Sequence, residues 1–230
     1  GANNGVLLSD DAFEGSDGRG IAAILKAGIE KGSNGKIYYA GEYYRTRVGG
    51  GIAWYDPITG LKDGLPIDVY RPFWLTSISN GEYMLMSCKE NGGKLLKFNV
   101  SRSNYDVITI DNISPGYIVG IGEHILGYGS DSELGPIVYR YNPSTNNIVW
   151  KKALPYGIVS SVSSNMKKLY ALEYDGESYV YMSVGQTLAK IDINSGLVEI
   201  LGSMDSVTNI TLHNGDIYSA GHMGFLKLTD

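Results

Sequence analysis

The chain contains five copies of one pattern, and this repeat constrains its fold more than any single residue does. Each copy has a Gly-led apolar stretch, a loop of small or polar residues, and a second apolar stretch. The second stretches end at Asp56, Asn99, Asn142, Asp192 and Thr229, with spacings of 43, 43, 50 and 37 residues. A β-type repeat with a period near 43 is typical of the four-stranded blades of a β-propeller.

The second stretch of each copy predicts a strand followed by a capped turn. Apolar and polar residues alternate in 137–141 and in 188–192, as in a strand with one wetter face. The turns that follow begin at Asp56, Asn142 and Asp192. Asp and Asn side chains accept backbone N–H groups in turns, Pro presets φ, and Gly or Asn tolerates a positive φ. A further apolar stretch then predicts an outer strand.

The first strand of each copy is less sharply marked. The Ala, Leu and Lys residues of 21–27 favour a helix, but the equivalent place in the other copies favours a strand. The Ser-rich stretch 157–167 is typical of a loop. We expect first strands at 21–27, 73–79, 117–121, 168–174 and 207–212.

These patterns predict an all-β chain, a β-propeller of four-stranded antiparallel blades with about five repeats. The last copy ends before its outer strand, and the apolar segment 5–9 belongs to no copy. We expect this segment to complete the last blade and close a five-bladed ring, because closure removes two exposed sheet edges. The alternative is that the blades are part of a larger propeller. We expect one domain, 1–230, with repeats at about 20–62, 72–112, 113–155, 157–202 and 203–230.

Composition and motifs exclude several classes of function. The formal charge of −5 and the isoelectric point near 5.2 argue against nucleic acid as a partner. No apolar run is long enough to span a bilayer. The one cysteine, Cys88, ends an apolar stretch and is expected to be a buried, inert thiol. The three histidines lack metal-ligand spacing, and no phosphate loop or dinucleotide motif is present, so no metal and no cofactor is expected.

Two paired segments carry a resemblance to known repeats. GKIYYAG with IAWYDPITG, and GEHILGYG with IVYRYNPSTN, resemble the blades of Kelch-like and quinoprotein-like propellers. The chain lacks the paired glycines of most Kelch blades, except at 49–51, and the Trp docking motif of quinoprotein blades. The resemblance implies a propeller and transfers no catalytic residue, since these blades serve enzymes and binding proteins alike. The segment YYRTR (43–47) with GGGIAWYDP (49–57) also resembles blades of large secreted bacterial proteins of the carbohydrate-processing kind, and this resemblance implies an extracellular or periplasmic location.

One end of the predicted blades carries a candidate binding face. Loops between second and third strands share that end with the connections between blades, and aromatic and guanidinium side chains gather there. Such groups suit stacking on sugar rings and bidentate contacts to carboxylates, with Asp131 and Glu133 as acidic counterparts. The alternative is that the aromatic residues pack between blades and the arginines form ion pairs. The candidate residues are Tyr43, Tyr44, Arg45, Arg47, Tyr70, Arg71, Trp74 and His222.

The sequence therefore predicts a non-catalytic binding or scaffolding propeller with a saccharide or a protein as ligand. A ring-bearing anionic ligand such as a uronic-acid saccharide would suit the candidate face. The alternative is a carbohydrate-active enzyme, a lyase or glycoside hydrolase, or the propeller part of one. Carboxylates paired across different blades would favour the enzyme. The sequence leaves the oligomeric state open.

Overall fold

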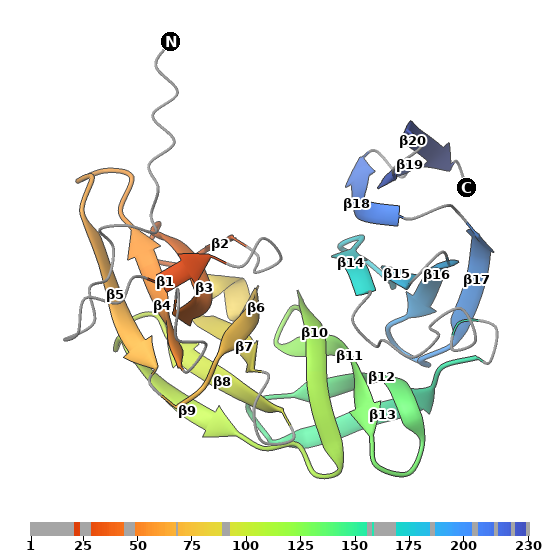
Figure 1. Cartoon of the computed structure of the whole chain (residues 1–230), viewed down its shortest axis with the longest axis horizontal. Helices are drawn as coiled ribbons and strands as arrows, with labels where there is room; N and C mark the ends of the chain where they lie inside the picture. Colours follow the sequence, from red (N-terminus) through yellow and green to blue (C-terminus); the bar gives the residue numbers. More distant parts are fainter. Residues whose placement is uncertain are drawn as a thin grey trace. The chain divides into compact units, whose positions relative to one another are not determined.

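A computed structural model of the chain describes most residues after the first twenty. The described residues form two compact units, 1–118 and 119–230, with the boundary inside one strand. Strands dominate both units, so the all-β prediction is confirmed (Figure 1). The described ranges are 21–23, 29–43, 49–67, 69–88, 93–155, 158, 169–184, 187–203, 207–213, 216–221 and 224–228.

The first unit contains two antiparallel sheets built from consecutive strands. Sheet 1 has the order β1-β3-β4-β5, and β2 also pairs with β3; sheet 2 has the order β6-β7-β8-β9. The 3-10 turn η1 (Ser79–Gly81) joins β6 to β7. The strands are β1 (Ile21–Ala23), β2 (Glu30–Lys31), β3 (Ile37–Tyr43), β4 (Gly50–Tyr55), β5 (Lys62–Ile67), β6 (Pro72–Ile78), β7 (Tyr83–Cys88), β8 (Lys94–Asn99) and β9 (Asn104–Ile108).

The unit boundary falls inside β10, the first strand of sheet 3. Sheet 3 has the order β10-β11-β12-β13, sheet 4 the order β14-β15-β16-β17, and sheet 5 the order β18-β19-β20. The strands are β10 (Ile113–Ile121), β11 (His124–Asp131), β12 (Gly135–Asn142), β13 (Asn147–Ala153), β14 (Leu169–Tyr174), β15 (Tyr179–Val184), β16 (Thr187–Asp192), β17 (Val198–Ser203), β18 (Val207–His213), β19 (Asp216–Gly221) and β20 (Gly224–Leu228).

The predicted first strands are present as β1, β6, β10, β14 and β18. Residues 21–23 form a strand that pairs with β3. Sheet 5 has three strands in the described residues, as the early end of the last repeat predicted. The segment 5–9, proposed to complete this sheet, lies outside the described residues, as does most of the stretch 157–167. Ring closure and the single-domain organisation stay predictions.

The glycines that lead the first four repeats are required by their backbone conformation; Gly215, which leads the fifth, lies outside the described residues. Gly35, Gly81, Gly122 and Gly176 have φ of +81°, +82°, +69° and +88°, a region that other residues enter at a cost. Each of them precedes the second long strand of its sheet. The repeat therefore begins with a tight turn that reverses the chain between two paired strands.

In sheets 1 to 4, an Asx residue at the end of the third long strand caps the turn that follows, as predicted for Asp56, Asn142 and Asp192. Asp192 Oδ1 accepts the N–H groups of Asn194 at 3.0 Å and Ser195 at 2.7 Å. Asp56, Asn99 and Asn142 each accept N–H groups from the second and third residues after them in the same way. In each of these four turns, one acceptor oxygen thus fixes the same backbone shape.

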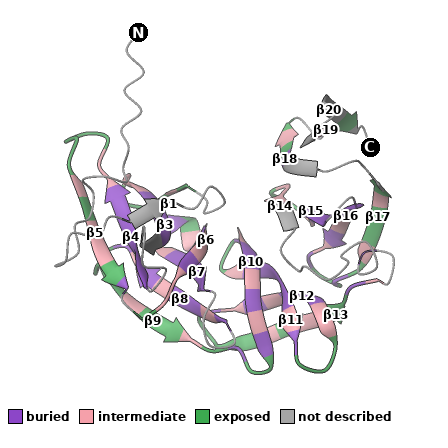
Figure 2. Ribbon diagram, viewed as in Figure 1, coloured by how far each residue is buried: buried purple, intermediate pink, exposed green. Residues whose placement is uncertain are grey.

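The core of the first unit lies between its two sheets. Strand β4 is buried along almost its whole length, whereas β5 and β9 are largely exposed or half-buried (Figure 2). The rings of Tyr38, Trp54 and Phe98 have centroids 5.7 to 5.9 Å apart, and Val100 is buried in the same cluster. Sheet 2 therefore packs on sheet 1 through these three rings and through Val100, the residue that follows the Asn99 cap.

Two further sequence predictions concern the described residues. Cys88 is buried, and burial raises the pKa of its thiol to about 12, so it is a protonated thiol at neutral pH. Within the described ranges, no helix is long and apolar enough to cross a bilayer.

Candidate functional site

Half of the predicted binding face lies outside the described residues. Tyr44, Arg45, Arg47 and His222 belong to this group. Tyr43 is the last residue of β3, where its backbone pairs with Ile21. A ligand-binding role for these residues stays a prediction.

The described aromatic residues of that face make packing contacts. The Trp74 indole donates from Nε1 to the carbonyl of Ile118 at 2.6 Å, and its ring meets the Tyr117 ring edge-on at 4.8 Å. Tyr70 is half-buried and packs against the core of the first unit, and Arg71 is also half-buried. Trp74 and Tyr70 thus hold structural positions, which agrees with the packing alternative considered from the sequence.

The two acidic residues expected on that face, Asp131 and Glu133, differ in their surroundings. Asp131 is buried at the end of β11 and accepts the backbone N–H groups of Glu133 and Leu134, each at 2.9 Å. Its other oxygen contacts Lys151 Nζ at 2.6 Å. The hydrogen bond from Lys151 and those from the backbone hold the Asp131 pKa at about 2. Asp131 therefore caps the loop between β11 and β12, and Glu133 is an exposed residue of that loop.

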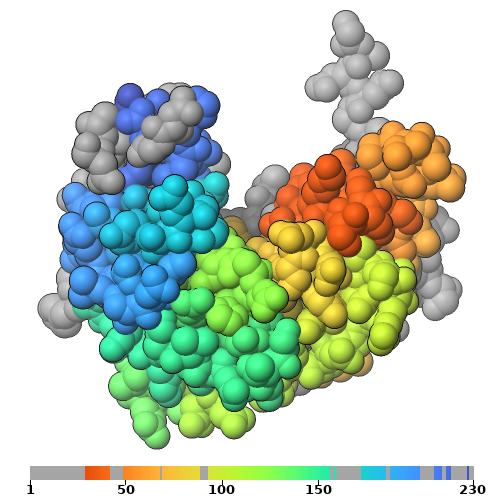
Figure 3. All heavy atoms as spheres, turned by 180° about the vertical axis from the view of Figure 1, so that it is seen from behind, coloured from red at the N-terminus to blue at the C-terminus, as the bar shows by residue number. Residues whose placement is uncertain are grey.

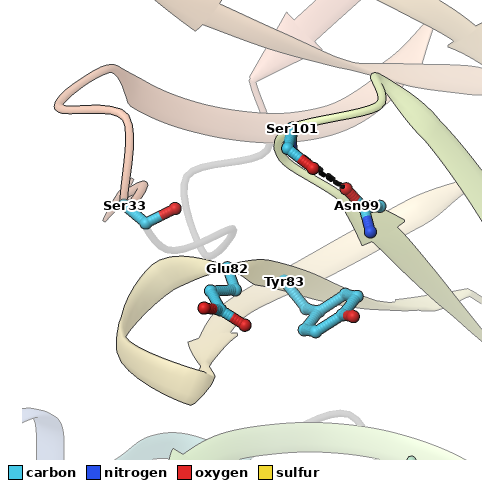
Figure 4. A pocket seen from close by; sticks show the side chains of 5 residues that line it. All are labelled: Ser33, Glu82, Tyr83, Asn99 and Ser101. Atoms are coloured by element: carbon cyan, nitrogen blue, oxygen red, sulfur yellow. Dashed lines mark hydrogen bonds between the residues drawn. The ribbon is translucent and has the colours of Figure 1, made fainter.

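A small polar depression lies beside sheet 2 in the first unit. Its volume is about 240 Å³, below the usual range of about 300–1,000 Å³ for ligand pockets. Glu82 and Tyr83 lie across it from Asn99 and Ser101 (Figure 4). Lys97 Nζ lies 4.2 Å from the centroid of the Tyr83 ring and occupies one of its faces. Ser33 lines the remaining side. We assign no ligand to this depression.

The capped turn of sheet 1 differs from its equivalents. The residue after the Asx cap is buried in the other three turns: Val100 is 4% exposed, Ile193 is 8% exposed, and Pro143 is buried. In sheet 1 the same position is Pro57, which is exposed. The next residue, Ile58, is 92% exposed, and Leu61 is 70% exposed. This turn therefore presents apolar surface to solvent.

Sequence reasoning missed this apolar turn, although a signal was present. The position of Ile58 holds a polar residue in the other three capped turns, namely Ser101, Ser144 and Asn194. Contiguous exposed apolar surface often marks an interaction site. The turn 56–61 is the candidate interface of the described residues.

The capped turn of sheet 4 shows how the residue after the cap is covered. The Ile193 carbonyl accepts hydrogen bonds from Trp150 Nε1 at 3.0 Å and from Arg140 Nη1 at 3.1 Å, both from sheet 3. Gly196, in the same turn, lies so close to Trp150 that an added Cβ would come within 2.8 Å of its ring. Atoms of sheet 4, in cyan and blue, lie directly against green atoms of sheet 3 (Figure 3). The capped turn of one sheet thus docks on the preceding sheet.

The described side chains include no group of three or more His, Cys, Asp or Glu residues that could hold a metal ion. His124 contacts Arg140 and Asn142. His213 is exposed, and its ring meets that of Tyr218 at 6.4 Å.

Comparison with solved structures supports the β-propeller fold. The chain superposes with a TM-score of 0.65 on a chain in the crystal structure of the mitotic checkpoint complex, at 7% identity. The structure of U3-55K gives the same TM-score at 12% identity. These matches cover 91% and 87% of this chain but only 63% and 60% of the other two. Both neighbours are of the propeller type, and they do not single out Kelch-like or quinoprotein-like blades.

Comparison of the sequence itself gave no match. No protein-family model and no curated protein sequence matches the chain.

Proposed function

We propose that the chain is a non-catalytic β-propeller scaffold that binds a protein partner through the turn 56–61. The observation that carries this proposal is the exposure of Ile58 and Leu61 on the one capped turn of sheets 1 to 4 whose residue after the cap is also exposed. Burying a side chain of this size stabilises a complex by roughly 1.5–3 kcal/mol. Two such residues on one turn form a plausible centre for an interface.

The docked turn of sheet 4 suggests the chemistry of the partner. Ile193 lies at the position equivalent to Pro57, and its carbonyl accepts an indole and a guanidinium N–H. We therefore expect the partner to offer an apolar patch with a Trp or Arg donor directed at the Pro57 carbonyl. One structural neighbour is itself a chain of a multiprotein assembly, the mitotic checkpoint complex.

The use of the turn carboxylates also favours binding over catalysis. Asp56, Asp192 and Asp131 each accept two backbone N–H groups. Asp175 accepts three, from Glu177, Ser178 and Tyr179. Carboxylates committed to backbone groups in this way stabilise turns and leave little capacity for acid–base work.

The test combines partner capture with a defined binding measurement. A captured protein is identified, purified and titrated against the wild-type chain by calorimetry. The double variant Ile58→Asp/Leu61→Asp should weaken its binding at least tenfold, about 1.4 kcal/mol or more. The control, Val107→Asp/Leu134→Asp, adds the same charge at two other exposed apolar residues and should leave binding unchanged.

The saccharide ligand expected from the sequence is tested in parallel. Binding of the wild-type chain to a panel of acidic glycans, lost in Arg45→Ala/Arg47→Ala, would assign a saccharide and replace the protein proposal. If the purified candidate proteins bind both double variants of the protein test equally, the turn 56–61 is not the interface.

A further inference from the structure

His124 lies at the junction between sheets 3 and 4 with a hydrogen-bond donor at each ring nitrogen. Arg140 Nε lies 2.9 Å from Nδ1, and Asn142 Nδ2 lies 2.9 Å from Nε2. The Asn142 amide is fixed in this orientation because its Oδ1 accepts the N–H groups of Ser144 and Thr145. Both neighbours therefore present N–H groups to the imidazole.

Arg140 connects the histidine to the next sheet. Its Nη1 donates to the Ile193 carbonyl at 3.1 Å and to Asn194 Oδ1 at 3.3 Å. The same carbonyl accepts the Trp150 indole at 3.0 Å. Arg140 thus links His124 to the Ile193 carbonyl, the same group that the Trp150 indole of β13 contacts in the capped turn of sheet 4.

The surroundings fit a neutral ring better than a protonated one, because a neutral ring can accept from one of the two donors and a protonated ring from neither. A guanidinium is always a donor, and a neutral imidazole offers one acceptor nitrogen, whereas an imidazolium offers none. Protonation would place an N–H opposite a donor at both nitrogens and a second positive charge beside Arg140. Burial lowers the His124 pKa, the Arg140 charge lowers it further, and Glu123 in the preceding turn opposes them. The charged groups acting on the ring from the described residues are Arg140 on β12 and Glu123.

We propose that His124 is an acid-sensitive latch, whose neutral ring holds Arg140 on the Ile193 turn and whose protonation releases it. A histidine whose folded pKa is lowered stabilises the folded state fully above its unfolded pKa, near 6.5. That contribution is lost as pH falls from there through the folded pKa. The junction between sheets 3 and 4 therefore loosens in mildly acidic solution, while the sheets themselves stay folded.

The two indole hydrogen bonds give a direct readout with an internal control. Trp150 donates across the junction to Ile193, whereas Trp74 donates to Ile118 in the first unit, away from any histidine contact that the structure describes. Hydrogen exchange of both indole N–H groups is followed by NMR at pH 7.5 and pH 5.5. Their ratio cancels the intrinsic pH dependence of exchange. We expect the Trp150-to-Trp74 ratio to rise at the lower pH, because protonation of His124 weakens the junction that protects the Trp150 indole.

The matched variant is His124→Asn, whose amide oxygen can accept from Arg140 without titrating. It should abolish the change in the ratio, while His213→Asn should leave the change as in the wild type. An unchanged ratio in the wild type, or the same rise in His124→Asn, would refute the latch. If His124→Asn does not fold, the NMR titration of the wild-type ring decides: a His124 pKa at or above the ordinary histidine value near 6.5 would also refute the latch.

Discussion

The Trp150 indole of β13 donates to the carbonyl of Ile193 across two sheets, 43 positions apart in the sequence. Replacing Trp150 with Phe keeps most of the apolar ring but removes this donor. A net loss of about 0.5–1.5 kcal/mol in the free energy of unfolding is expected, because that is the usual contribution of one hydrogen bond. Urea denaturation measures it. Val149→Ala, an exposed neighbour, should change stability by no more than about 0.5 kcal/mol.

The stability of the capped turn of sheet 4 should depend on one acceptor oxygen, Oδ1 of Asp192. Asp192→Ala should lower the melting temperature by about 2–4 °C, because the N–H groups of Asn194 and Ser195 lose their acceptor. Asp192→Asn should melt close to the wild type, since Asn99 and Asn142 cap the equivalent turns with an amide oxygen. An Asn variant as unstable as the Ala variant would show that the charge matters more than the acceptor.

The same residue predicts an acid dependence. Hydrogen bonds from Ser195 lower the Asp192 pKa below its ordinary value. A carboxylate whose folded pKa is lowered stabilises the protein above its unfolded pKa, near 3.9, and this contribution is lost as pH falls below it. Melting temperatures between pH 5 and pH 2.5 should therefore fall more steeply for the wild type than for Asp192→Asn.

The strands and their capped turns could be predicted from the sequence, because the hydrogen bonds of a turn form between residues close together in the chain. Asp56, Asn142 and Asp192 were predicted to cap their turns, since a side chain and the N–H groups that it binds lie within three residues. The contact of His124 with Arg140 could not be predicted, because it depends on the pairing of β11 with β12. The packing role of Trp74 depends on Ile118, 44 residues away. The exposure of Ile58 could have been predicted by aligning the four capped turns, because the other three have a polar residue at its position.

Lys151 makes the largest contribution to the low pKa of Asp131. Replacing Lys151 with Met removes the contact at 2.6 Å that contributes most to the low Asp131 pKa of about 2. The Asp131 pKa should rise, and the stability of the variant at neutral pH should fall, because a buried carboxylate then lacks its cation. NMR titration of the Asp131 carboxyl carbon measures the shift. A pKa that stays near 2 would mean that the backbone N–H groups alone suffice.

Two of the repeat-leading glycines separate backbone strain from steric clash. Gly122→Ala adds a methyl group that meets no atom within 4 Å, so only its φ of +69° is unfavourable, at a cost of about 1–2 kcal/mol. Gly81→Ala has the same kind of strain and also brings Cβ to 2.7 Å from the Lys31 carbonyl oxygen. Gly81→Ala should be the more destabilising in urea denaturation. Equal losses would show that the backbone at Lys31 shifts without cost.

Every described sheet pairs strands that follow one another in the chain, apart from β1, which pairs with β3 and not with the short β2 between them. No described sheet needs a strand that is synthesised much later than its other strands. Each sheet can therefore form soon after its residues leave the ribosome. Contacts that are short in sequence also cost little loop entropy, which favours rapid folding for a β protein. We therefore expect the slower steps during synthesis to be the docking of one finished sheet on the next, as at the capped turn of Ile193.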